Sequence, residues 1–168
     1  MKIKIIKYAA VLIAFVLLMI LAIEFTGKKY FEREGYTWWS NDGIVLVRGN
    51  NIDKIRDDID KLTYAINRSD NDPETFRTPE NKEPVDPPKL KLIGIKGNIA
   101  SVEVINAEHL TQRMGSSGAD NFLAQSTFTL TENKNIKFVN FVFEEGDHAS
   151  PGIYSRNDFL VRWKPIIN

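Results

Sequence analysis

The five residues EEGDH at positions 144–148 gather the groups of this chain that are best suited to chemistry. Three carboxylates and an imidazole fall within them, on Glu144, Glu145, Asp147 and His148. Carboxylates and imidazoles act as general acids and bases, and the same groups bind metal ions. Whether they act together depends on the elements that position them.

The spacing of these residues argues against an active site. Glu144 and Glu145 are adjacent, so on a strand they point to opposite faces. They cannot then flank one bond at the roughly 5 to 9.5 Å that a two-carboxylate hydrolase requires. Asp147, His148 and Ser150 provide the residue types of a catalytic triad, but such close neighbours in sequence do not reach its geometry through space.

A metal site is not expected either. Zinc needs three or four convergent ligands, whereas the chain has no Cys and only two His, at His109 and His148. We therefore predict a polar turn after a buried strand, in which Gly146 permits a positive φ angle. No catalytic residue, cofactor or metal ligand is assigned, and we expect the protein not to be an enzyme.

The N-terminus carries an uninterrupted apolar run, residues 8–23. With the isoleucines before it, the segment reaches the ~20 residues that cross a bilayer. We predict a cytoplasmic tip and transmembrane anchor over residues 1–27. Lys2, Lys4 and Lys7 precede the run, which favours a cytoplasmic N-terminus and an extracytoplasmic remainder of a single-pass cell-membrane protein. A cleaved signal peptide is the alternative, disfavoured by the length of the run and the lack of a small-residue cleavage site.

Residues 28–42 are interpreted as a juxtamembrane segment, and 43–168 as the extracytoplasmic domain. Trp38 and Trp39 could either lie at the headgroup level or pack against the domain. The absence of Cys excludes disulfides and a lipid-attached cysteine. The net charge is zero, so no basic surface for nucleic acid is expected.

The periodicity of the domain predicts a small α+β fold. Asn51 is a suitable N-cap for its first helix, Gly97-Asn98 is a hairpin turn, and a strand that is apolar on both sides is central. Two helices on one face of a three- or four-stranded sheet then make a two-layer sandwich. In chain order we expect a strand at 44–47, a helix at 51–67, a proline-rich loop at 68–89, a hairpin at 89–105, a turn and small-residue loop at 106–121, a helix from Gly118, and a central strand at 136–144.

Several segments resemble the GerMN domain of spore germination and sporulation proteins. They are Ala-Ser-Val-Glu-Val at 100–104, Phe-Thr-Leu-Thr at 128–131, Val-Asn-Phe-Val at 139–142 and Glu-Gly at 145–146. Residues 157–162 look like the short final strand of the family, and the segment from 44 resembles its opening strand and Arg. The proline-rich loop replaces a small Gly-Pro element of the family, and a membrane helix replaces its lipid-attached Cys.

The resemblance implies a non-catalytic extracytoplasmic domain that binds a protein partner in the cell envelope, which could be a second copy. No small-molecule substrate is expected. Two alternatives are left open. One is a cell-wall hydrolase that uses Glu144, Asp147 or His148 as acid or base. The other is a cell-wall polymer-binding module in which exposed rings stack on sugars, with Trp38, Trp39, Tyr154 and Trp163 as the candidate rings.

Overall fold

The computed structural model describes residues 35–41, 45–69 and 86–167, all of which belong to one compact unit, Glu34–Asn168. The anchor expected over 1–27 and most of the loop expected over 68–89 lie outside the described residues. Within the described part of the chain, no helix is long and apolar enough to cross a membrane.

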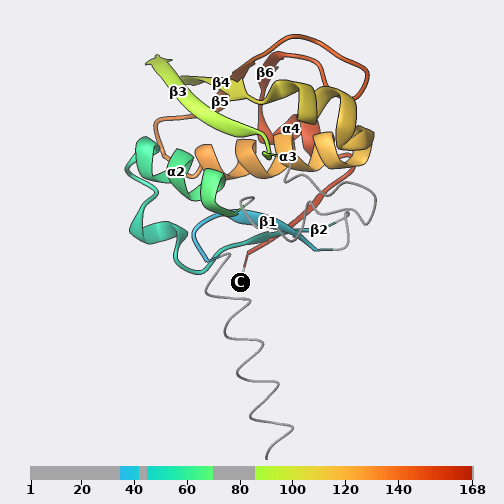
Figure 1. Ribbon diagram of the computed structural model, residues 1–168. Coiled ribbons are helices and arrows are strands. Elements are labelled where there is room, and N and C mark those ends of the chain that lie inside the picture. Colours follow the sequence, from blue (N-terminus) through green and yellow to red (C-terminus); the bar gives the residue numbers. More distant parts are fainter. Residues whose placement is uncertain (1–34, 42–44, 70–85, 168) are drawn as a thin grey trace, which may run out of the picture. The chain divides into compact units, whose positions relative to one another are not determined.

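The fold is α+β, as predicted, but it contains two sheets where one was expected (Figure 1). The smaller sheet has the order β1-β2-β7, in which β1 (Trp38–Asn41) is antiparallel and β7 (Lys164–Ile166) is parallel to the central strand β2 (Val45–Arg48). The strand expected at 44–47 therefore exists, but it does not join the main sheet. β1 and β7 have no counterpart among the predicted elements.

The larger sheet has the order β3-β4-β5-β6. The expected hairpin is β3 (Lys89–Lys96) and β4 (Ile99–Ile105), and Gly97 adopts a positive φ of 61° in its turn. Next to it, β5 (Phe138–Val142) is parallel to β4 and antiparallel to β6 (Gly152–Tyr154).

The central position predicted for β5 is confirmed, but its burial on both sides is not. Val139 and Phe141 are buried, whereas Phe138 and Val142 on the other side are 37% and 43% exposed. Of the described helices, α2 packs on β3 and α3 packs on β5, on the face that carries Val139 and Phe141.

Helix α3 (Gly115–Leu130) lies between the two sheets (Figure 1). The apolar face predicted for it is buried: Ala119, Phe122, Leu123, Ser126 and Leu130. Ala124, Thr127, Phe128 and Thr129 are buried as well, so its second half is enclosed on every side. A helix buried all round needs cover on both sides, and β1 provides it opposite the larger sheet. The unit has three layers, which corrects the predicted two-layer sandwich.

The first helix begins later than predicted. A short 3₁₀ turn, η1 (Ile52–Lys54), comes first, and α2 (Ile59–Ser69) follows. The Asn51 side chain makes no capping bond. Asp58 takes this role, since its Oδ1 accepts the backbone N–H of Lys61 at 3.2 Å, three residues on.

Two further expectations are wrong. The segment expected as a turn and loop at 106–121 is largely helical: the π-helix η2 (His109–Arg113) precedes α3, which begins at Gly115. The final strand expected within 157–162 is also absent. The chain there forms the end of the short helix α4 (Arg156–Phe159) and a turn, and Ser155 and Asp158 close a capping box at the start of that helix.

Candidate functional site

The EEGDH stretch lies in the loop between β5 and β6, as predicted. The role expected for Gly146 is wrong, because its φ is not positive. A Cβ added to it would lie 2.6 Å from Cβ of Thr111 and 2.6 Å from Nε2 of Gln112. The backbone N–H of His148 also donates to the carbonyl oxygen of Thr111 at 3.1 Å. Gly146 is thus required for the close approach of this loop to η2.

The possible triad residues bond to other groups. Ser150 Oγ donates to Oε1 of Glu145 at 2.7 Å. His148 Nδ1 instead lies 3.2 Å from Oγ of Ser116, in the first turn of α3. The sequence did not indicate this contact, since positions 115–118 were interpreted as loop. Among the described residues, no group of three or more His, Cys, Asp or Glu could hold a metal ion.

A shallow pocket of about 410 Å³ lies beside the first turns of α3. Its acidic group is Asp120, whose Oδ2 accepts the indole N–H of Trp163 at 2.8 Å and whose Oδ1 pairs with Arg162 at 3.0 Å. The carboxylate is therefore already neutralised by the protein. The lining residues are Ser116, Ser117, Gly118, Asp120, Asn121, Arg162 and Trp163.

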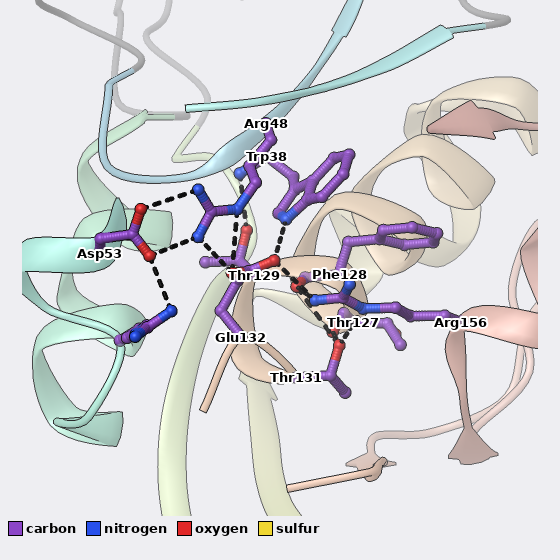
Figure 2. A network of polar contacts seen from close by, with 10 residues as sticks. Trp38, Arg48, Asp53, Thr127, Phe128, Thr129, Thr131, Glu132 and Arg156 are labelled. Carbon is purple, nitrogen blue, oxygen red and sulfur yellow. Dashed lines mark hydrogen bonds and ion pairs between the residues drawn. The ribbon is translucent and has the colours of Figure 1, made fainter. Parts of the chain in front are cut away.

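Among the described residues, the densest set of polar contacts surrounds Glu132, just after α3 (Figure 2). Its Oε1 accepts bonds from Nε1 of Trp38 at 2.9 Å and Nη2 of Arg156 at 2.8 Å. Its Oε2 lies 2.6 Å from Nη2 of Arg48. Arg48 also makes a two-pronged pair with Asp53, at 2.8 and 3.0 Å. The network joins β1, β2, α3 and α4.

Arg156 also closes the end of α3. It donates to the carbonyl oxygen of Phe128 at 2.9 Å, one of the last four helix carbonyls, which have no partner within the helix. Its guanidinium carbon lies 5.0 Å from the ring centre of Phe128 and 5.5 Å from that of Trp38. The backbone N–H of Trp38 donates to Oγ1 of Thr129 at 3.0 Å. The Phe-Thr-Leu-Thr segment is therefore structural.

The charges of the network are fixed. Burial by itself would raise the pKa of Glu132, whose side chain is only 9% exposed. Hydrogen bonds from Arg48, Trp38 and Arg156 outweigh that effect and hold its pKa below the ordinary value. Hydrogen bonds to Asp53 and Glu132 raise the pKa of Arg48 in turn. Such a carboxylate stays ionised near neutral pH and has no proton to exchange. The network therefore has a structural role: it holds the small sheet, α3 and α4 together.

Sequence alone missed Glu132 and Arg156. One signal was present: a carboxylate directly after a helix faces the negative end of its dipole, so Glu132 needs cations from elsewhere. The sequence does not show that Arg48 and Arg156 provide them, because they lie 84 and 24 positions away.

The rings considered for sugar stacking are mostly unsuitable. Trp38 and Trp163 are 1% and 3% exposed, so neither can form an open platform. Tyr154 is half-buried, stacks on Phe159 with ring centres 5.7 Å apart, and donates its hydroxyl to the Ser150 carbonyl oxygen. Trp39 is half-buried on the opposite side of β1 from Trp38.

The larger sheet has an outer face on which the described helices do not pack. Alternation along the strands places a row of apolar side chains on it, away from α2 and α3. Ser101, Asn140 and the ion pair between Lys91 and Glu103, 3.3 Å long, lie on the same face. The exposed apolar residues of this outer face are Ile105, Phe138, Val142 and Ile153, between 37% and 57% exposed.

Comparisons of the chain with family models, curated proteins and solved structures found no match.

Proposed function

We propose that the protein is a membrane-anchored, non-catalytic domain that binds another protein of the cell envelope through the outer face of the larger sheet. The observation that carries the proposal is the row of exposed apolar side chains on that face: Ile105, Phe138, Val142 and Ile153. Exposed apolar side chains gathered on one face, with polar groups among them, are typical of protein interaction sites.

The composition of the outer face suits a protein partner. An interface of this kind combines an apolar centre with polar groups that bond across it. Asn140 and Ser101 lie beside the apolar row, and Lys91 and Glu103 provide charges of both signs.

The position of the outer face agrees with an anchored protein. β1 is the first described strand after the N-terminal segment, and it lies in the small sheet. α3 separates that sheet from the larger one (Figure 1). The chain therefore enters the folded unit in one layer and presents the apolar row in the opposite layer.

We also propose that the domain is of the GerMN type. The quoted segments fall on β4, the end of α3, β5 and the loop after it, in the order of the family pattern. The helix found where the family has a final strand departs from that pattern. Superposition of a solved GerMN domain on the β3–β6 sheet with α2 and α3 tests the family proposal. A domain that could not be superposed would contradict it.

Photo-crosslinking in membranes of the source organism tests the binding proposal. A photoreactive amino acid replaces Val142 on the outer face in the full-length protein. Val161, which is 93% exposed and follows α4, takes the same replacement as the matched control. We expect a discrete adduct from position 142 only, and its loss when Ile153→Glu is added.

Three results can be distinguished. An adduct of twice the chain mass means that the partner is a second copy. A heavier or lighter discrete adduct identifies another protein by mass spectrometry. Identical adduct patterns from positions 142 and 161 would show that the outer face has no specific partner, and the proposal would then be wrong.

A further inference from the structure

The small sheet has an outer side of different chemistry. Trp39, Val47 and Ile166 are aligned across its three strands, and aligned neighbours project from the same side of a sheet. Trp38 and Leu46, which alternate with them, are 1% and 0% exposed and lie in the core that includes α3. The first three side chains therefore point away from α3.

This side is apolar and carries no acidic group among the residues that the structure describes. Val45 lies on it two positions before Val47 and is aligned with Lys164, the one charged residue that the described strands place on this side. Ile166 is 45% exposed, Trp39 and Val45 are half-buried, and Val47 on the central strand is only 9% exposed. The outer face of the larger sheet, by contrast, carries the acidic Glu103.

The length of the chain before β1 limits how far the small sheet lies from the apolar run. Only 14 residues, 24–37, separate the apolar run from Trp38. Even a fully extended chain spans at most about 3.6 Å per residue, so the small sheet lies within about 50 Å of the end of that run. Tethering makes contact with the nearby surface intramolecular, so a weak affinity is sufficient.

We infer that the outer side of the small sheet, with Trp39, Val45 and Ile166, lies on the headgroup region of the bilayer that holds the N-terminal segment. The inference rests on the proposed membrane anchor. A Trp at the edge of an apolar surface suits the interface, and Lys164 can extend its ammonium group to lipid phosphates. The domain would then be oriented with the outer face of its larger sheet away from the membrane.

Single-cysteine labelling tests the inference, because the chain has no native Cys. The full-length protein is reconstituted into vesicles of phosphatidylcholine and phosphatidylglycerol, with or without a headgroup spin-labelled lipid as quencher. A fluorophore is attached at Ile166→Cys and, as a second position on the same side, at Lys164→Cys. Ile153→Cys on the outer face of the larger sheet is the matched control, since Ile153 is similarly exposed, at 57% against 45% for Ile166.

We expect the spin-labelled lipid to quench the label at 166 and at 164 at least about twice as strongly as the label at 153. Equal quenching at all three positions would overturn the inference. So would a label at 166 that is shielded from both lipid and water-soluble quenchers, because a second copy would then cover this side.

Flotation of the same vesicles separates this result from a failure of the anchor. A protein that does not float with the vesicles contradicts the anchor and, with it, the docking inference. A protein that floats but shows equal quenching contradicts only the docking of the small sheet.

Discussion

Arg48 and Glu132 form the shortest ion pair of the described residues, with 2.6 Å between Nη2 and Oε2. The two side chains are 15% and 9% exposed. Arg48 ends β2 of the small sheet, and Glu132 follows α3. The pair therefore connects the small sheet to the central helix α3 and helps to hold the two in place.

The first prediction concerns how much the Glu132 network contributes to the stability of the fold. Glu132→Gln keeps the shape of the side chain but leaves Arg48 and Arg156 without their common counter-charge. Breaking a buried pair costs about 3 to 5 kcal/mol. Because Arg156 is 34% exposed, water compensates part of this loss, and we expect a free energy of unfolding lower by about 2 to 3 kcal/mol. Urea denaturation of the variant and the parent protein measures the difference.

The matched control is Glu103→Gln, which removes an ion pair with Lys91 on the open sheet. These side chains are 45% and 68% exposed, and surface pairs of this kind contribute less than about 1 kcal/mol. Equal losses in the two variants would show that the Glu132 network does not stabilise the fold more than a surface pair does.

The second prediction is a pH dependence. The folded-state pKa of Glu132 lies below its ordinary value of 4.5, so the folded protein binds this proton less readily than the unfolded chain does. Its stabilising effect is complete above about pH 4.5 and is lost as the pH falls through the lowered folded value. The stability difference between the parent protein and Glu132→Gln should therefore shrink below pH 4.5.

Denaturation curves of both proteins between pH 7 and pH 3 test this prediction. The pKa values of Asp53, Asp58 and Asp158 are also lowered. The last two are outside the network, so their contributions should largely cancel in the comparison. A difference that stays constant to pH 3, in a range where both proteins still fold, would contradict the assigned cause.

The elements that could be predicted from sequence are those with a local pattern. The hairpin follows from alternation around Gly97-Asn98, and the core face of α3 follows from spacings of three and four. The α+β class follows from both. The start of α2 was predicted too early, because Ile52 and Ile55 continue its apolar stripe through a 3₁₀ turn. Periodicity alone cannot separate the two kinds of helix there.

The small sheet could not be predicted as a whole, because its third strand depends on a distant partner. β7 pairs with β2 across more than 110 positions, and Lys164–Ile166 is too short to show an alternating pattern. Trp38 was ambiguous for the same reason, since only the position of α3 makes it a core residue. The contact between Ser116 and His148 likewise depends on how the loop packs against η2.

The third prediction concerns Gly146. In Gly146→Ala the new Cβ would meet Cβ of Thr111 at 2.6 Å, and the backbone of the loop or of η2 would have to move. Forced packing of this kind costs about 1 to 3 kcal/mol, and the melting temperature should fall accordingly. Gly94→Ala in β3 is the matched control, since nothing lies within 4 Å of the position that its new methyl group would take. If Gly146→Ala and Gly94→Ala had the same melting temperature, the close packing of this loop would be contradicted.

The fourth prediction separates the binding domain from the hydrolase alternative. Glu144 and Asp147 are exposed, and His148 lies beside Ser116 without a carboxylate partner among the described contacts. Changing all three to Ala should therefore leave the crosslinked adduct at position 142 unchanged, because none of them lies in the apolar row. The cellular phenotype of a deletion strain should also be restored fully by the triple variant. If the triple variant folds and reaches the membrane yet restores nothing, and if purified parent protein releases soluble fragments from cell-wall polymer, the loop is an active site and the protein is a hydrolase.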